Sequence, residues 1–229
     1  MTTFASSRSQ AITLSPSTEA QVYGLLTLAM LLTLFGVFFG TMAAQTLLFT
    51  GAHIIFLIAE LAIIFTSGFW ANKSPLNYIL FGLFPVLSGF TITPYLLYYV
   101  LSNFENGSVI LFDAALTTVF MTAAAAVFAR TTSINLAGMR GVLFMGLIGL
   151  LVVGILQIFL PALQQLELVI AGAGVLLFAA FITFDIQRTQ VQARAGGNPF
   201  LLALSLYLDI FNLFLYVVRF MVAMSGNRR

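Results

Sequence analysis

Long runs of apolar residues, separated by short polar breaks, follow one another along the sequence from residue 22 onward. A helix needs about 20 such residues to cross the hydrocarbon of a bilayer. Seven runs are long enough, at 22–44, 51–70, 78–101, 109–129, 141–160, 168–187 and 200–222. The strict alternation of apolar and polar residues that marks β-strands is absent, and a chain in lipid must pair its own backbone groups. The pattern therefore predicts an all-α membrane protein, a bundle of seven transmembrane helices.

Composition supports this prediction. Of the 229 residues, 61% are hydrophobic and 7% are charged, whereas soluble domains carry about 25% charged residues. We expect one transmembrane domain (22–222), a polar N-terminal tail (1–21) and a short C-terminal tail (223–229). The N-terminal tail carries no apolar core, so a cleavable signal peptide is not expected. The lack of cysteine excludes disulfides, thiol catalysis and thiolate metal sites.

The basic residues indicate how the chain is oriented in the membrane. Those that fall on the side of the N-terminus are Arg8, Lys73, Arg130, Arg140, Arg188 and Arg194. Between the predicted helices, the other side carries Glu105 and Glu167 and no Lys or Arg. The positive-inside rule then predicts a cytoplasmic N-terminus and, after seven crossings, an external C-terminus. Arg228 and Arg229 at the C-terminal end favour the opposite orientation, but they are outnumbered.

Two aspartates, Asp185 and Asp209, lie within or at the edge of the last two predicted helices. An acid at this depth is costly, so it is a functional candidate. With a rise of about 1.5 Å per residue, both carboxyl groups are expected at one level in the cytoplasmic half, on neighbouring helices. In contact, they would share a proton and titrate as one unit, a proton-operated latch; they could equally bind Ca²⁺. A third interpretation is that each one only caps a helix or makes a local hydrogen bond.

Other polar residues could work with this pair. Glu60 lies in the middle of the second span and Arg219 in the outer third of the last, so an ion pair between them is expected. The alternative for Arg219 is that it extends to the interface. Asn212, one turn after Asp209, is expected to support the pair or to bond across helices. Lys73 is expected to anchor the chain at the interface or to counter the aspartates.

The signatures of soluble enzymes are missing from the sequence. It has no Gly-rich phosphate loop, no His-Glu-x-x-His pattern and no nucleophile elbow. One histidine, His53, argues against most zinc and base-driven hydrolase schemes. Intramembrane aspartyl proteases also use two aspartates, but their Gly-x-Gly-Asp context is absent here. We therefore expect neither an enzyme nor a cofactor.

The last predicted helix contains the run Ala203-Leu-Ser-Leu-Tyr207-Leu-Asp209-Ile-Phe-Asn212-Leu-Phe, with Arg219-Phe after it. Earlier segments that belong with it are Phe184-Asp185-Ile-Gln, the stretch from Ser88-Gly89 to Pro94, and Glu60. Together they resemble the Bax inhibitor family, also called the transmembrane Bax inhibitor motif (TMBIM) family. The resemblance covers the whole chain.

This resemblance implies a seven-helix fold in which the last helix is central and the other six surround it. It also implies a pH-sensitive calcium leak, with Asp185 and Asp209 as the pH sensor and Ca²⁺ as the permeant ion that meets them transiently. Glu60 and Arg219 would form a charged latch on the pore. Relatives often carry a basic cluster after the second helix, where this chain has Lys73 alone. The short tail suggests a bacterial member, in the cell (inner) membrane.

Two other functions stay open. One is a non-conducting regulator of a membrane-bound AAA protease, in which the N-terminal tail would be needed. The other is a proton-coupled transporter for a small solute. The expected partners are the lipid bilayer, Ca²⁺, protons and a membrane protease; the net charge of +2 is too small to argue for nucleic acid.

Overall fold

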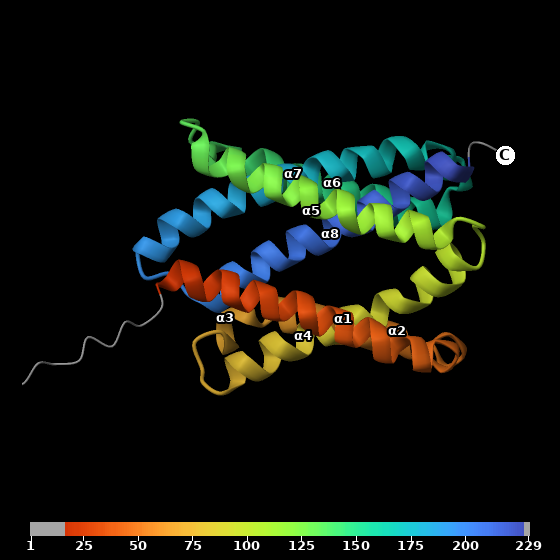
Figure 1. The fold of residues 1–229 in the computed structure, drawn as a ribbon, viewed down its shortest axis with the longest axis horizontal. Helices are drawn as coiled ribbons and strands as arrows, with labels where there is room; N and C mark the ends of the chain where they lie inside the picture. The colour runs from red at the N-terminus through yellow and green to blue at the C-terminus, as the bar shows by residue number, and fades with distance from the viewer. Residues whose placement is uncertain (1–16, 227–229) are drawn as a thin grey trace, which may run out of the picture.

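The computed structural model describes residues 17–226, and helices make up nearly all of that range (Figure 1). Arg8, Arg228, Arg229 and most of the predicted N-terminal tail lie outside it. In chain order the elements are α1 (Thr18–Thr50), α2 (Ala52–Phe65), α3 (Ser67–Trp70), α4 (Leu76–Pro94), the π-helix η1 (Tyr95–Leu101), α5 (Gly107–Thr131), the 3-10 helix η2 (Leu136–Met139), α6 (Arg140–Phe159), the 3-10 helix η3 (Pro161–Leu166), α7 (Glu167–Arg194) and α8 (Pro199–Gly226).

Each predicted span contains a helix, so the all-α prediction is confirmed. Six helical segments in the described range are long and apolar enough to cross a membrane. The second predicted span is different, because α2 has 14 residues and is only about 21 Å long, less than the roughly 30 Å of hydrocarbon. Thr66 separates α2 from the short helix α3. The structure is therefore a membrane bundle of six long helices and one shorter apolar helix within residues 17–226.

One predicted boundary is wrong. We expected a break over 45–50, but α1 continues through these residues and ends at Thr50. The helix stops at Gly51, which has a left-handed backbone with φ of 69° and donates its N–H to the Leu48 carbonyl. A polar side chain such as Gln45 does not end a helix, whereas a glycine in this conformation does.

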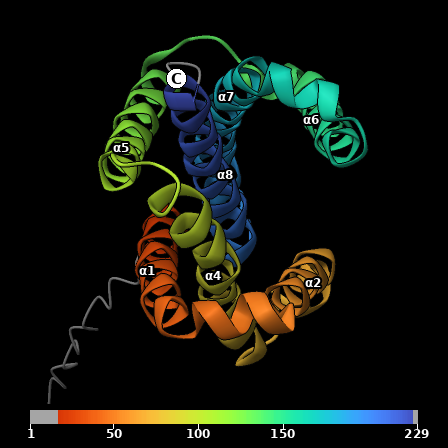
Figure 2. The same ribbon diagram turned by 90° about the vertical axis from the view of Figure 1, so that its right-hand side faces the viewer.

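Helix α8 lies between two groups of helices. Viewed along the bundle, α1, α2 and α4 lie on one side, and α5, α6 and α7 on the other (Figure 2). Half of the residues in the apolar centre of α8 are buried, a larger share than in any other long helix of the described range. The outer helices instead expose large apolar side chains; Val142 and Ile158 of α6 are 71% and 76% exposed. Such a surface suits lipid rather than water.

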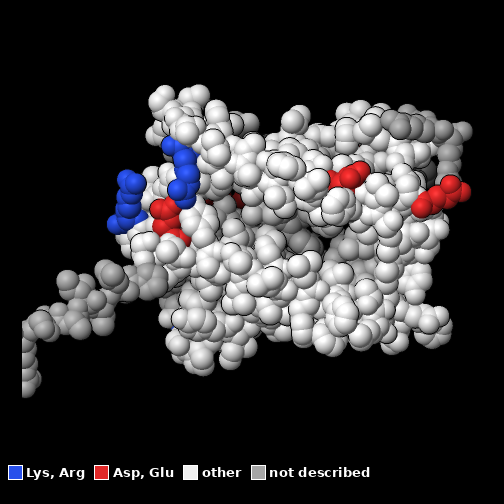
Figure 3. Space-filling model, in the orientation of Figure 1, with Lys and Arg blue, Asp and Glu red and all other residues white. Residues whose placement is uncertain are grey.

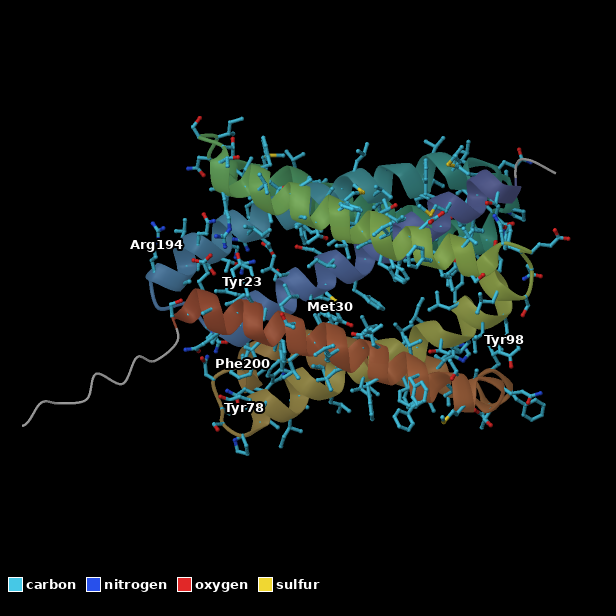
Figure 4. The ribbon with its side chains drawn as sticks, viewed as in Figure 1. Tyr23, Met30, Tyr78, Tyr98, Arg194 and Phe200 are labelled. Carbon is cyan, nitrogen blue, oxygen red and sulfur yellow. The ribbon has the colours of Figure 1, made fainter. Side chains whose placement is uncertain are left out.

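Aromatic contacts hold the first half of α8 against α4. The Phe200 ring lies edge-on to Tyr78 and Phe81, with ring centroids 4.9 and 5.7 Å apart. Tyr207 meets Phe84 in the same way, at 5.6 Å. Figure 4 shows Tyr78 and Phe200 together near one end of the bundle, and Tyr98 at the opposite end. Edge-on aromatic pairs of this kind orient the two helices as well as filling space.

Charge is distributed unevenly between the two ends. On the face seen in Figure 3, basic side chains appear only at the end where α1 begins, whereas acidic ones appear at both ends. At the basic end, Arg130 forms an ion pair with Glu19, 2.7 Å apart, and lies over the Tyr23 ring. This asymmetry is the one that the loop composition predicts.

Helices α1 and α4 approach so closely that their backbones touch. A Cβ atom placed on Gly89 would lie 2.4 Å from the Thr33 carbonyl oxygen and 2.6 Å from the Val37 nitrogen. A Cβ on Gly36 would lie 2.3 Å from the Val86 carbonyl oxygen. Backbone atoms cannot move aside as a side chain can, so only glycine fits at these positions.

We expect Gly89→Ala to destabilise the protein by about 1–3 kcal/mol, because the added methyl group forces α1 and α4 apart. The matched control is Gly149→Ala in α6, where nothing lies within 4 Å of the new Cβ. That control should be neutral or slightly stabilising, since alanine favours helix. Thermal unfolding in detergent measures both variants. Equal melting temperatures would show that the α1–α4 contact tolerates a side chain.

Candidate functional site: a buried pair of aspartates

The turn between α7 and α8 makes these helices antiparallel neighbours. Helix α7 ends before Gly196, which has φ of 78°, and the Gly197 N–H donates to the Gln192 carbonyl over 2.8 Å. The Asn198 carboxamide oxygen accepts from the backbone N–H of Phe200 at 2.8 Å and so caps α8. Its Nδ2 donates to the Ala71 carbonyl at 2.9 Å, which attaches the turn to the end of α3. The register of α7 against α8 is therefore held at this end.

The structure brings Asp185 and Asp209 together. Asp185 is in α7 and 4% exposed, and Asp209 is in α8 and 7% exposed. Asp209 lies close enough to interact electrostatically with both Asp185 and Arg188. The two carboxyl groups thus form one buried group at the contact of the two helices, as the helix-rise argument predicts.

The two carboxyl groups have different surroundings. Asp185 accepts a short hydrogen bond from the Ser205 hydroxyl of α8, and Arg188 lies 3.3 Å from its Oδ1. Oδ2 of Asp209 is buried and makes no hydrogen bond to any residue in the described range. Leaving a charged oxygen buried without a partner is costly. A proton held between the two acids would give Oδ2 of Asp209 a hydrogen-bond partner. The same proton would remove one of the two negative charges.

The cation beside the pair is Arg188, which the sequence analysis did not select. Lys73 lies exposed in the turn between α3 and α4, and it makes no ion pair with either aspartate. Asn212 donates to the Leu208 carbonyl of its own helix at 2.8 Å, so the expected contact with the pair or across helices is not formed. Arg188 and Ser205 could have been found from spacing. Arg188 follows Asp185 by three residues and Ser205 precedes Asp209 by four, so each shares a helix face with its acid.

Glu60 belongs to a different polar group, between α2, α4, α8 and α1. Its carboxylate accepts hydrogen bonds from Ser88 at 2.7 Å and from Thr91 at 2.5 Å, both in α4. Next to them, the Tyr207 hydroxyl of α8 bonds to Thr33 of α1 at 2.8 Å. Glu60 is 7% exposed, and these hydroxyl groups provide the partners that a central acid requires.

The expected ion pair between Glu60 and Arg219 is not formed. Arg219 instead pairs with Glu167, the first residue of α7, through Nε–Oε1 and Nη2–Oε2 contacts of 2.7 and 2.9 Å. Gln157 bridges the pair, accepting from Arg219 and donating to Glu167. The physical reason is the helix arrangement: the C-terminal part of α8 lies beside the start of α7 and reaches Gln157 of α6, whereas α2 packs on α4. Hydropathy predicts depth but not which helices are neighbours.

A cavity of about 790 Å³ opens beside this ion pair, at the end of the bundle opposite the aspartates. Its walls include Tyr95 and Tyr99, whose rings stack 5.1 Å apart, together with Gln157, Glu167 and Arg219. The lining thus combines aromatic rings, carboxamides and one ion pair with apolar side chains such as Leu168 and Val222.

Nothing in the described range is arranged as a resident metal site, because no three His, Cys, Asp or Glu side chains come together there. Two carboxylates alone supply fewer oxygen atoms than the about six to eight ligands that Ca²⁺ takes.

Comparison with known proteins assigns the family. A family model described as "Inhibitor of apoptosis-promoting Bax1" matches residues 16–227. The chain belongs to the Bax inhibitor family.

The chain is also similar to individual proteins. It is 38% identical over 63 residues to protein lifeguard 4 of Mus musculus, covering 27% of the chain and 26% of that protein. It is also 38% identical over 76 residues to the uncharacterized protein YrjE of Lactococcus lactis subsp. lactis (strain IL1403), covering 31% and 32%. The chain thus spans about a quarter to a third of these curated relatives. The resemblance seen in the sequence is confirmed.

The Arg219–Glu167 contact can be tested by a double-mutant cycle. We expect Arg219→Gln to destabilise the bundle by about 1–2 kcal/mol, because it breaks charge-assisted hydrogen bonds that are partly exposed. Glu167→Gln should cost a similar amount, and the double variant less than the sum. Detergent unfolding curves measure all three. The control is Arg194→Gln, since Arg194 is exposed at the other end of the bundle. Strictly additive effects would show that the pair contributes nothing.

Proposed function

We propose that this protein is a pH-sensitive cation leak, with Ca²⁺ as the permeant ion, and that the Asp185–Asp209 pair gates it. The observation that carries the proposal is the pair itself, two buried acids on adjacent helices with one carboxyl oxygen left without a hydrogen-bond partner in the described range. Membership of the Bax inhibitor family supports it. The many exposed apolar side chains support a multi-pass position in a membrane.

The proposed arrangement has seven spans, in which α2 and α3 together complete the second and α8 is central. The N-terminus is cytoplasmic and the C-terminus external, in the cell membrane. The uneven charge of the two ends supports this orientation, because basic residues prefer the cytoplasmic side. The aspartates then lie in the cytoplasmic half and the Arg219–Glu167 pair at the external end.

The proposed mechanism follows from the charge of the pair. When the two acids share a proton, one hydrogen bond joins α7 to α8. When both are ionised, they repel each other, by about 4 kcal/mol for two unit charges 4 Å apart at an effective dielectric constant of 20. Arg188 offsets only part of this repulsion, because it is half-buried and 3.3 Å from one oxygen. A change of several kcal/mol is enough to shift a two-state helix arrangement from one side to the other.

The external cavity provides the other end of the proposed path. Its volume is about 790 Å³, and Glu167 and Gln157 are among the residues that line it. Their side-chain oxygen atoms accept hydrogen bonds from Arg219, so an entering cation would have to displace this arginine. Oxygen ligands are those that Ca²⁺ prefers. In this scheme the Arg219–Glu167 pair lies where a cation enters, and the aspartates lie where it leaves.

Calcium flux into liposomes that hold the purified protein, measured across a pH series, tests the gate. We expect the wild-type flux to change with pH. Asp185→Asn with Asp209→Asn should leave the flux independent of pH, because neither amide can titrate. The matched control is Asp113→Asn, which removes an exposed acid from α5 and should keep the wild-type profile.

Two results would contradict the proposal. A pH profile that survives in the double asparagine variant would show that the sensor lies elsewhere. A wild-type protein that passes no ion at any pH would end the leak proposal, and regulation of a membrane-bound AAA protease or proton-coupled transport would then be the interpretations to test.

A further inference from the structure

A second pocket lies at the basic end of the bundle, beside α7. Its volume is about 290 Å³, and it is formed by the start of α6 with η2 on one side and the last turns of α7 on the other. Arg140 and Arg188 are both among the residues that line it, together with Asn135 and Gln192. An anion in this space would be attracted by both positive charges.

The wall of this pocket is held in place by one side chain. The Gln187 carboxamide accepts from the Leu136 N–H at 3.1 Å and donates to the Ile134 carbonyl at 3.0 Å. Gln187, which belongs to α7, thereby holds residues 134–136, which precede α6, against α7. The pocket is thus formed without a ligand, which lowers the entropic cost of binding one.

The two arginines retain donors for an anion. Arg140 makes no hydrogen bond or ion pair to any residue from 17 to 226. Arg188 uses only Nη1, in long contacts of 3.3 Å to Asp185 and 3.5 Å to Ser205. A planar guanidinium with free N–H groups matches phosphate oxygens well.

The surroundings favour a lipid over a soluble anion. Val191, at the rim, is 69% exposed, and Phe184 forms part of the wall. On α6, the neighbouring Val142 and Met145 are 71% and 69% exposed. A cationic pocket thus opens directly onto an apolar surface, as an interfacial headgroup with acyl chains below it requires.

We propose that this pocket binds the phosphate-bearing headgroup of an anionic phospholipid, in the leaflet at the basic end of the bundle. Arg188 lies beside both the pocket and Asp185, so the carboxylate of Asp185 offsets part of the positive charge that the headgroup meets. The proposal does not depend on whether the bundle conducts ions, because it concerns binding alone.

Native mass spectrometry of the full-length protein, titrated in detergent with phosphatidylglycerol or phosphatidylcholine, measures the affinity. We expect wild type to bind phosphatidylglycerol more tightly. Arg140→Gln should weaken that binding about fivefold, the contribution typical of one arginine near an anionic membrane. Arg194→Gln is the matched control: it removes the same charge from α7 near the same end of the bundle, outside the pocket lining, and should change affinity less than twofold.

The position of Arg188 between the two sites gives a second, opposite readout. Asp185→Asn should tighten phosphatidylglycerol binding severalfold, because the negative charge that offsets Arg188 is then removed. Asp113→Asn also removes one negative charge and should have no effect. An excess of inorganic phosphate should not displace the lipid.

Each contrary result overturns the proposal in a distinct way. If wild type binds the two lipids with equal affinity, the basic end attracts lipids in general and the pocket is not a site. The same conclusion follows if Arg140→Gln and Arg194→Gln lose equal affinity for phosphatidylglycerol. Displacement by inorganic phosphate would assign the pocket to a soluble anion. These outcomes are independent of the flux measurement, so failure of the leak proposal and failure of this one are distinguishable.

Discussion

The contact between Asp185 and Asp209 is the constraint around which the rest of the bundle is arranged. In a chain with 7% charged residues, two acids meet at one buried helix contact. Their helices must therefore pack closely enough to provide mutual partners, because hydrocarbon provides none. The Asn198 cap and the short turn hold α7 and α8 in the register that places Ser205 on Asp185. Burial of these acids and close packing of the last two helices thus depend on each other.

The remaining contacts join the other helices to each other and to α8. Helices α1 and α4 touch backbone to backbone at Gly36 and Gly89, and Glu60 joins α2 to α4 through two hydroxyl groups. The C-terminal half of α8 is held to the start of α7 by the Arg219–Glu167 ion pair. In the proposed gate, a change of charge at the aspartates acts first on the α7–α8 contact, because the two acids lie on these two helices.

The sequence predicts depth well and neighbours poorly. Six of the predicted spans follow from apolar length, because the hydrocarbon thickness sets a minimum that few other features can mimic, whereas the second holds the shorter helix α2. Asp185 and Asp209 were also placed correctly, since a short connection and a fixed rise per residue determine their relative height. The partner of Arg219 was not predictable in this way. Glu60 and Glu167 both lie at suitable depths, and only the arrangement of helices around the axis of α8 decides between them.

Arg188 shows how two sites can be connected through one side chain. Its guanidinium contacts Asp185 and Ser205 through Nη1 alone, which leaves its other N–H groups for an anion in the pocket. Any anion that draws it toward Arg140 removes positive charge from the neighbourhood of the aspartates. Thermodynamic reciprocity then applies to the proposed site. Anion binding changes the affinity of the aspartates for a proton by the same factor by which protonation of the aspartates changes the affinity of the pocket for the anion. Contacts of 3.3 and 3.5 Å are long enough to be given up at small cost, so in the proposed scheme this one arginine couples the lipid pocket to the aspartates.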